Sequence, residues 1–194
     1  MEDLAAIRPP EACARIAADA RRLGFDMNSE PAVGCLLRTL AASKPRGRFL
    51  ELGTGTGLAS AWLLDGMCAG SCLVTVDNDP APLEIATRNL GADKRLTVIC
   101  ADGDSYLHGA TADAKKFDFI FADTWAGKYH LLDEALALLD RHGFFVIDDM
   151  LPRSGWPNGH AEKAAALLAA LDRRDDLLVT RMGWSCGVVI CVRR

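Results

Sequence analysis

The sequence predicts a single α/β domain with a seven-stranded, mostly parallel sheet, helices on both faces and two extra N-terminal helices. Short apolar segments alternate with helix-like segments from residue 48 onward. The strand-like segments are apolar throughout, as in strands that are buried on both faces of a sheet. No repeat or linker interrupts the 194 residues. One domain is therefore expected, with N-terminal helices in residues 1–44 and the sheet in residues 48–194.

Two helices are predicted before the sheet. Residues 9–23 begin with two prolines and carry apolar residues at helical spacing. Residues 29–44 begin with Ser-Glu-Pro, and the Pro-Arg-Gly sequence at 45–47 ends this second helix.

Strands and helices then alternate to the end of the chain. The predicted strands are residues 48–53, 72–79, 95–102, 117–123, 143–149, 177–183 and 187–194. The predicted helices are residues 58–67, 80–91, 128–141 and 159–172. The loop between the last two strands is too short for a helical crossover, so the last strand is expected to be antiparallel.

Composition narrows the class of protein. Half of the residues are apolar, a quarter are charged and the net charge is −4. Nucleic-acid surfaces usually carry a basic excess, so a nucleic acid is not the expected partner. The chain has no apolar run of about 18 residues and no apolar segment near its acidic start, so we expect neither a membrane span nor a signal peptide. Seven cysteines without a CxxC pair indicate reduced thiols and a cytoplasmic location.

A glycine-rich loop follows the first predicted strand, in the stretch LELGTGTGLAS. Gly53, Gly55 and Gly57 would let the backbone approach a ligand beside the free N–H groups of a helix N-terminus. The dinucleotide motif GxGxxG would require glycine at position 58, which is Leu58. The negative charge of Glu51 would favour a cationic ligand group and repel a pyrophosphate.

Acidic residues end the next strands as well. Asp77 ends the second predicted strand, where a carboxylate can accept hydrogen bonds from both hydroxyls of a ribose. Asp102 ends the third, where it or Gly103 could meet the edge of a base. Each acid could instead only cap a helix or face solvent. Together with the glycine loop, however, they fall in the crevice where open α/β sheets bind ligands.

Longer segments carry a family resemblance. FLELGTGTGLASAWL, VTVDNDP and CADGDSYL resemble the class I S-adenosylmethionine-dependent methyltransferases, which have a Rossmann-like fold. FDFIFADTWAGKYHLLDEALALLDRHGFFVIDDML is similar to the matching segment of the catechol and caffeoyl-CoA O-methyltransferases. The resemblance extends from about Met27 to the C-terminus.

The resemblance implies a cofactor site for S-adenosylmethionine. Glu51 and Gly53 would border its methionine part, Asp77 would hold the ribose, and Asp102 with Gly103 would lie beside the adenine. The residues expected to bind the cofactor are Glu51, Gly53, Thr54, Gly55, Gly57, Asp77, Asn78, Asp102, Gly103 and Asp123.

The resemblance also implies a divalent cation, Mg²⁺ or Ca²⁺, on Asp123, Asp148 and Asp149. Carboxylates are suitable ligands for these ions, and such a cation could activate a bound hydroxyl. The chain departs from the family in two places. Many members have a lysine where Ala126 stands, and an Asn where Asp149 stands. The alternative is that Asp148 and Asp149 only end a strand and cap a loop.

Aromatic and basic side chains complete the expected site. Trp125 and Trp156 are predicted to line a substrate pocket, because loops at this edge of a sheet usually form sites; ordinary partial burial is the alternative. Asp123, Lys128 and His160 are the candidate catalytic residues, although Lys128 is expected in a first helical turn and His160 could simply start a helix.

The predicted function is S-adenosylmethionine-dependent O-methylation of a small aromatic acceptor. The alternatives are methyl transfer to a nitrogen atom or to RNA, and cofactor binding without methylation. In the related family the N-terminal helices cover the site or join subunits, which makes a homodimer possible. The expected partner is a small molecule, with no membrane involved.

Overall fold

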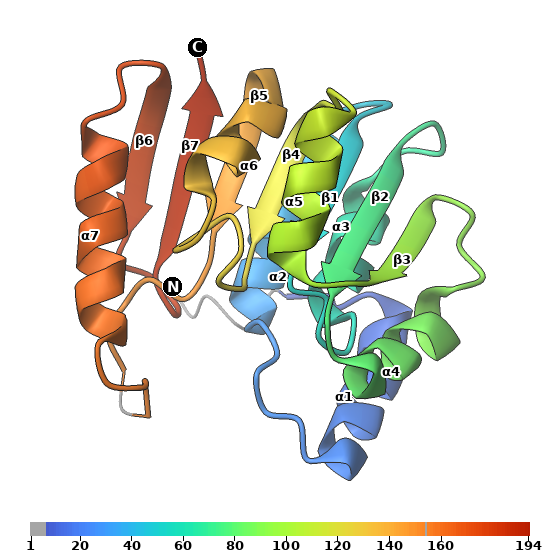
Figure 1. The fold of residues 1–194 in the computed structure, drawn as a ribbon. Coiled ribbons are helices and arrows are strands. Elements are labelled where there is room, and N and C mark those ends of the chain that lie inside the picture. Colours follow the sequence, from blue (N-terminus) through green and yellow to red (C-terminus); the bar gives the residue numbers. More distant parts are fainter. Residues whose placement is uncertain (1–6, 154) are drawn as a thin grey trace.

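The structure is a computed structural model that describes residues 7–153 and 155–194. Figure 1 shows a central twisted sheet with helices on both sides. The helices are α1 (Glu11–Leu23), α2 (Pro31–Ala42), α3 (Leu58–Gly66), α4 (Pro80–Leu90), α5 (Gly103–Ala112), α6 (Leu132–Leu138) and α7 (His160–Asp172). The strands are β1 (Arg48–Leu52), β2 (Cys72–Asp77), β3 (Leu96–Cys100), β4 (Phe117–Ala122), β5 (Leu139–Ile147), β6 (Leu177–Met182) and β7 (Val188–Arg193).

The seven strands form one sheet in the order β3-β2-β1-β4-β5-β7-β6. The first five strands pair in parallel, and β7 lies antiparallel between β5 and β6. The prediction of a mostly parallel sheet whose last strand is antiparallel is therefore confirmed. Chain order reverses between β1 and β4, and at such a switch point the loops after the two strands separate and leave a crevice.

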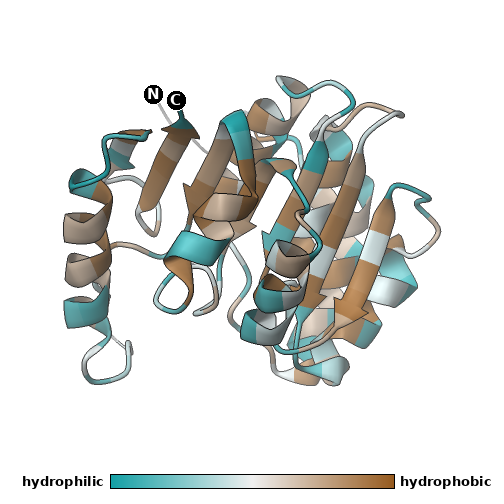
Figure 2. Cartoon of the chain, turned by 45° about the horizontal axis from the view of Figure 1, so that its top comes forward, coloured by the Kyte–Doolittle hydropathy of each residue, from teal (hydrophilic) through white to brown (hydrophobic). Residues whose placement is uncertain are grey.

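Two hydrophobic cores hold the layers together. Side chains of α5, α6 and α7 pack on one face of the sheet, and those of α1, α2, α3 and α4 contribute to the core on the other. Figure 2 shows the apolar residues concentrated on the strands, with hydrophilic residues on loops and outer helical turns. None of the helices in the described part of the chain is long and apolar enough to span a lipid bilayer.

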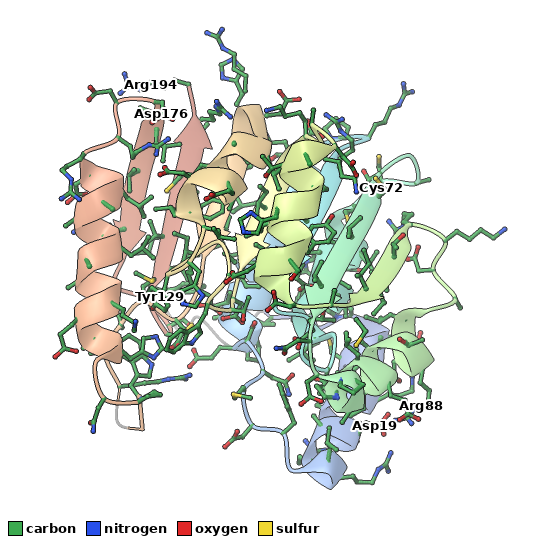
Figure 3. All side chains as sticks on the ribbon, viewed as in Figure 1. Asp19, Cys72, Arg88, Tyr129, Asp176 and Arg194 are labelled. Carbon is green, nitrogen blue, oxygen red and sulfur yellow. The ribbon has the colours of Figure 1, made fainter. Side chains whose placement is uncertain are left out.

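The N-terminal helix α1 is joined to α4 by hydrogen bonds of one buried carboxylate. The buried Asp19 accepts hydrogen bonds from Arg88, at 2.7 Å, and Asn89, at 3.0 Å. Figure 3 shows Asp19 and Arg88 facing each other between the two helices. Hydrogen bonds from these partners lower the pKa of Asp19 to about 2, so the carboxylate remains charged at neutral pH.

One predicted helix was wrong in extent, and one helix was missed. The predicted helix over residues 128–141 contains only α6, because β5 already begins at Leu139. Residues 123–131 form a loop instead, closed by a bridge between Ala126 and His130, and Leu131 has the positive φ of 52°. Helix α5 was not predicted. Its residues GDSYLHGATA include two glycines and bury only Leu107 and Ala110, which gives a weak apolar stripe.

Candidate active site

Two adjoining cavities lie beyond the carboxyl ends of β1, β2, β4 and β5. The larger has a volume of about 780 Å³ and is also bordered by residues 25–30, which connect α1 to α2. The smaller has a volume of about 390 Å³. Gly53, Asp77, Asn78, Thr124 and Trp125 border both cavities. The pair therefore forms an extended site at the switch point of the sheet.

The glycine loop adopts the conformation that its sequence predicts. Gly53, Gly55 and Gly57 have φ values of 96°, 51° and 87°, a region that side chains strongly disfavour. A Cβ atom on Gly53 would lie 2.7 Å from the carbonyl oxygen of Asp123, and one on Gly57 would lie 2.8 Å from the Cβ of Ala86. The loop therefore passes close to the end of β4 and to α4, and Gly53 and Gly55 border the larger cavity.

Glu51 lies beneath this loop and borders neither cavity. Its fully buried carboxylate accepts hydrogen bonds through Oε2 from the hydroxyls of Ser60 and Thr75, and Thr75 contacts Thr54 at 2.6 Å. Its Oε1 atom has no partner within the described residues. Burial raises the pKa of Glu51 to about 7, against the effect of the two hydroxyls. Its direct contact with a cofactor stays a prediction.

Asp77 connects the glycine loop to the second strand. Its Oδ2 atom accepts a hydrogen bond of 2.8 Å from the amide of Gly55, and Oδ1 accepts one of 3.1 Å from the amide of Asp79. A carboxylate offers about four acceptor positions, so two remain for ligand hydroxyls. Asn78 follows at the surface, and both side chains border the two cavities.

The smaller cavity contains the predicted base-binding residues. Asp102 is the N-cap of α5 and accepts hydrogen bonds from the amide and hydroxyl of Ser105 at 2.8 and 2.9 Å. Asp102 therefore caps a helix, as the alternative prediction held, and it also borders the cavity. Gly103 is adjacent, and a Cβ atom there would lie 2.6 Å from that of Ala126.

Aromatic side chains form one wall of the larger cavity. The indole of Trp156 stacks on the imidazole of His160 with ring centres 4.1 Å apart, and His160 Nε2 lies 2.9 Å from the hydroxyl of Tyr129. Trp125 packs edge-on against Tyr129 and is 41% exposed. His160 does begin α7, and its Nδ1 atom is buried without a partner in the described part of the chain. Burial lowers its pKa, so the neutral imidazole is favoured.

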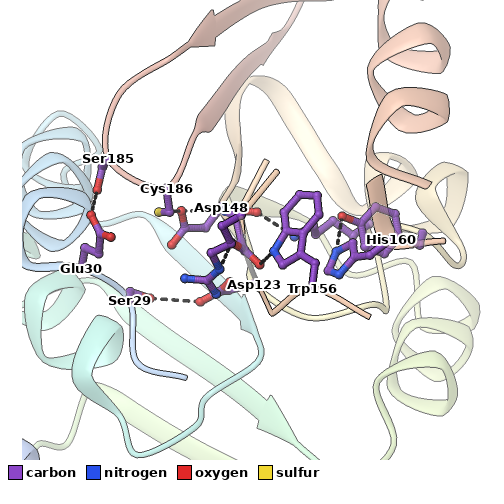
Figure 4. Close-up of polar contacts among 12 residues, drawn as sticks. Ser29, Glu30, Asp123, Asp148, Trp156, His160, Ser185 and Cys186 are labelled. Carbon is purple, nitrogen blue, oxygen red and sulfur yellow. Dashed lines mark hydrogen bonds and ion pairs between the residues drawn. The ribbon is translucent and has the colours of Figure 1, made fainter. Parts of the chain in front are cut away.

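The three acids of the predicted metal site already have partners, and Figure 4 shows those of Asp123 and Asp148. Asp123 Oδ2 accepts a hydrogen bond from Ser29 at 3.0 Å. Asp148 Oδ1 accepts from the thiol of Cys186 at 2.7 Å. Asp149 Oδ2 accepts from the indole of Trp156, and its Oδ1 lies 3.2 Å from Arg153.

The described residues show no arrangement of these acids as a metal-binding cluster. Across residues 7–153 and 155–194, no group of three or more His, Cys, Asp or Glu side chains is arranged to hold a metal ion. Asp149 has the left-handed φ of 57° and is held by Trp156 and Arg153. The predicted cation on Asp123, Asp148 and Asp149 therefore finds no support in this arrangement.

Lys128 lies among the acids and not in a helical turn, which corrects the prediction for this residue. It is only 4% exposed, and its ammonium donates a hydrogen bond of 2.6 Å to the backbone carbonyl of Asp148. Burial lowers the pKa of Lys128, while Asp123, Asp149 and Asp148 act in the opposite direction. Burial and the nearby Asp148 raise the pKa of Asp123 well above its usual range.

Four further residues of the site were not identified from the sequence. Ser29, Tyr129, Arg153 and Cys186 border the larger cavity and contact the predicted residues. No signal in the sequence identified Ser29, which was predicted to start a helix, or Cys186, because their partners lie 94 and 38 residues away in the chain. Tyr129 and Arg153 each lie within five residues of a predicted site residue.

The sequence has recognisable relatives. A family model described as a methyltransferase domain matches residues 50–150, which is just over half of the chain.

The chain belongs to this methyltransferase family.

A protein of Mycobacterium marinum named as an O-methyltransferase is 43% identical over 174 residues, covering 84% of this chain and 76% of the relative. One of Mycobacterium bovis with the same name is 30% identical over 192 residues, covering 92% and 84%. A third match, to a Mycolicibacterium vanbaalenii protein, spans 61% of that relative's length, and two more span 34% of theirs.

Solved methyltransferase structures share the fold. The O-methyltransferase of Bacillus cereus in complex with S-adenosylhomocysteine (SAH) superposes with a TM-score of 0.85 at 18% identity, covering 98% of this chain and 94% of that one. The O-methyltransferase TomG of Streptomyces achromogenes, in complex with S-adenosylmethionine, gives 0.83 at 21% identity, covering 97% and 92%. The predicted class I methyltransferase fold is therefore confirmed.

Proposed function

We propose that this methyltransferase transfers the methyl group of S-adenosylmethionine to a hydroxyl oxygen of a small aromatic acceptor. The observation that carries the proposal is the continuity of the two cavities. Gly53 and Asp77 lie at the shared boundary, with Asp102 and Gly103 on the side of the smaller cavity and Tyr129, Trp156 and His160 on the side of the larger one. One side suits a nucleoside with an amino acid tail, and the other suits a flat ring.

The residues of the first side fit S-adenosylmethionine. Asp77 retains acceptor positions for the ribose hydroxyls, and Asp102 with Gly103 would lie along the base. Glu51 borders neither cavity, so its unpartnered Oε1 would act on the cationic amino group of the methionine part through water and not by direct contact. A dinucleotide is disfavoured, because its pyrophosphate would meet the carboxylates that surround the glycine loop.

Asp123 is the proposed base. It borders the larger cavity, and its Oδ1 atom makes no hydrogen bond to the described residues. Its raised pKa makes it a stronger base than an ordinary carboxylate. When bound, S-adenosylmethionine supplies an electrophilic methyl group. The acceptor oxygen forms its bond to this carbon as the carbon–sulfur bond breaks, and the hydroxyl proton passes to Asp123.

The aromatic wall would orient the acceptor. Trp156 and His160 stack on each other and present a rigid edge to the cavity, while Trp125 remains partly exposed above it. Rigid aromatic side chains bind flat rings at low entropic cost, and correct orientation is a large part of the rate enhancement in a two-substrate reaction. His160 is retained as a second candidate for proton transfer, because its neutral form is favoured.

The test is the release of SAH when the protein and S-adenosylmethionine are mixed with a panel of catechols and phenols. The matched control panel carries amino groups in place of the hydroxyls. We expect release with the hydroxylated panel and none above background with the amines. Release with the amines alone would support the nitrogen-acceptor alternative. Cofactor binding by calorimetry without release on either panel would contradict the proposed enzyme.

A further inference from the structure

Lys128 has an unusual position for a charged side chain. Its backbone belongs to the loop after β4, yet its side chain is only 4% exposed and its ammonium lies at the end of β5. Its backbone amide is also held, donating to the carbonyl of Trp125 at 3.2 Å. A lysine buried to this degree usually has a specific partner for its charge.

The ammonium of Lys128 has more N–H donors than the described residues offer it hydrogen-bond acceptors. Lys128 Nζ carries three N–H groups, and within the described residues it makes one hydrogen bond, to the carbonyl of Asp148. No carboxylate of the described residues lies within the 4.0 Å ion-pair distance of it. The ammonium also lies over the ring of Tyr129, 5.1 Å from its centre, and because Lys128 borders the larger cavity a remaining N–H group can reach a ligand there.

Three neighbouring acids favour a cation at this position, because Asp123, Asp149 and Asp148 all act to keep Lys128 protonated. Asp123, Asp148 and Asp149 border the same cavity, and their mutual repulsion is costly without compensation. Lys128 supplies one positive charge, and Arg153 supplies another at 3.2 Å from Asp149. A divalent cation bound here would be repelled by both, and the protonated lysine has no lone pair to offer it.

We infer that the Lys128 ammonium takes the place of a divalent cation in this site, binding the acceptor oxygen and compensating the three carboxylates, so that methyl transfer is metal-independent. The inference rests on the proposed function for the acceptor.

The ammonium can do what a cation would do for the acceptor. It donates a hydrogen bond to the oxygen and stabilises the negative charge that develops as the hydroxyl proton passes to Asp123. A fixed, preorganised donor is well suited to stabilise such charge. Oxygen then forms the new bond to the methyl carbon, the carbon–sulfur bond breaks, and the ammonium keeps its proton throughout.

The experiment compares the wild type with Lys128→Met, using thermal melts and turnover with and without EDTA or Mg²⁺. In the wild type, neither EDTA nor Mg²⁺ should change the melting temperature or the turnover. Lys128→Met should lose roughly 100-fold in kcat/KM, the scale for removing one stabilising donor. The variant should also gain a Mg²⁺-dependent rise in melting temperature, because its three acids are no longer compensated.

Two variants control the comparison. Lys94→Met removes an exposed lysine that borders neither cavity, and it should behave as the wild type. Lys128→Arg keeps the charge, and it should show no Mg²⁺-dependent shift even if its turnover falls. This variant keeps the test decisive if Lys128→Met does not fold.

Two outcomes would overturn the inference. One is loss of wild-type turnover in EDTA with restoration by Mg²⁺. The other is a Mg²⁺-dependent melting shift in the wild type equal to that of Lys128→Met. Calorimetry with SAH separates these results from a failure of the proposed function, since a wild type that binds no SAH would contradict the function itself.

Discussion

The ammonium of Lys128 donates a hydrogen bond of 2.6 Å to the backbone carbonyl of Asp148. This contact joins the loop after β4 to the end of β5. It holds the two loops that carry Asp123, Trp125 and Asp149 at a fixed separation. The geometry of the proposed acceptor site therefore depends on a side chain whose position the local sequence did not indicate.

Asp77 is expected to contribute strongly to cofactor affinity. Asp77→Ala should weaken SAH binding by about 1.5–3 kcal/mol, the scale of hydrogen bonds to a charged group. Calorimetry measures this change directly. Asp113→Ala alters the net charge equally at an exposed position of the α5 C-terminus, and it should leave the affinity unchanged. Equal affinities for the two variants would remove Asp77 from the site.

Glu51 is expected to make stability depend on pH. Its pKa is raised from 4.5 to about 7, so between these values the folded state holds a proton that the unfolded state has lost. Stability should therefore fall as pH rises from 4.5 to 7, by up to roughly 3 kcal/mol from this group. Glu51→Gln should flatten that slope in urea unfolding. An unchanged slope in this variant would show that Glu51 does not titrate as described.

Asp123 is expected to act on turnover more than on binding. Asp123→Asn keeps the shape of the side chain but removes its basicity, so kcat should fall roughly 100-fold or more while SAH affinity changes little. Because the pKa of Asp123 is raised, wild-type kcat should decline in acid at a higher pH than an ordinary carboxylate would give.

Ser29→Ala is the control for Asp123. The hydrogen bond from Ser29 to Oδ2 lowers the pKa of Asp123, and this variant removes only that bond. The variant should therefore retain most of the turnover. A kcat for Asp123→Asn equal to that of the wild type would assign proton transfer to another residue, with His160 the next to test.

Trp156 is expected to affect the acceptor alone. It borders the larger cavity and not the smaller one. Trp156→Ala should raise KM for an aromatic acceptor by roughly 2- to 10-fold, as expected for one lost aromatic contact. Trp156→Phe keeps an aromatic ring, although a smaller one without the hydrogen bond to Asp149, so its KM should lie closer to the wild type. A change in SAH affinity without a change in KM would contradict this role.

The sequence predicted most of the sheet because its apolar segments and glycine loop are local signals. The strand ends alone placed Asp77, Asp102 and Asp123 at one edge. What failed depended on tertiary contacts. The fully buried environment of Lys128 and the early start of β5 at Leu139 follow from packing between loops, which periodicity does not report.

The most direct measurement of the central claim is the position of the transferred methyl group. The protein is incubated in EDTA with S-adenosylmethionine labelled with ¹³C at the methyl carbon and an acceptor that carries both a phenolic hydroxyl and an amine, and the product is examined by NMR. The account predicts a methyl ether on the ring, formed in equal amount with SAH. A label on the amine nitrogen, or SAH formed without a labelled ether, would contradict it.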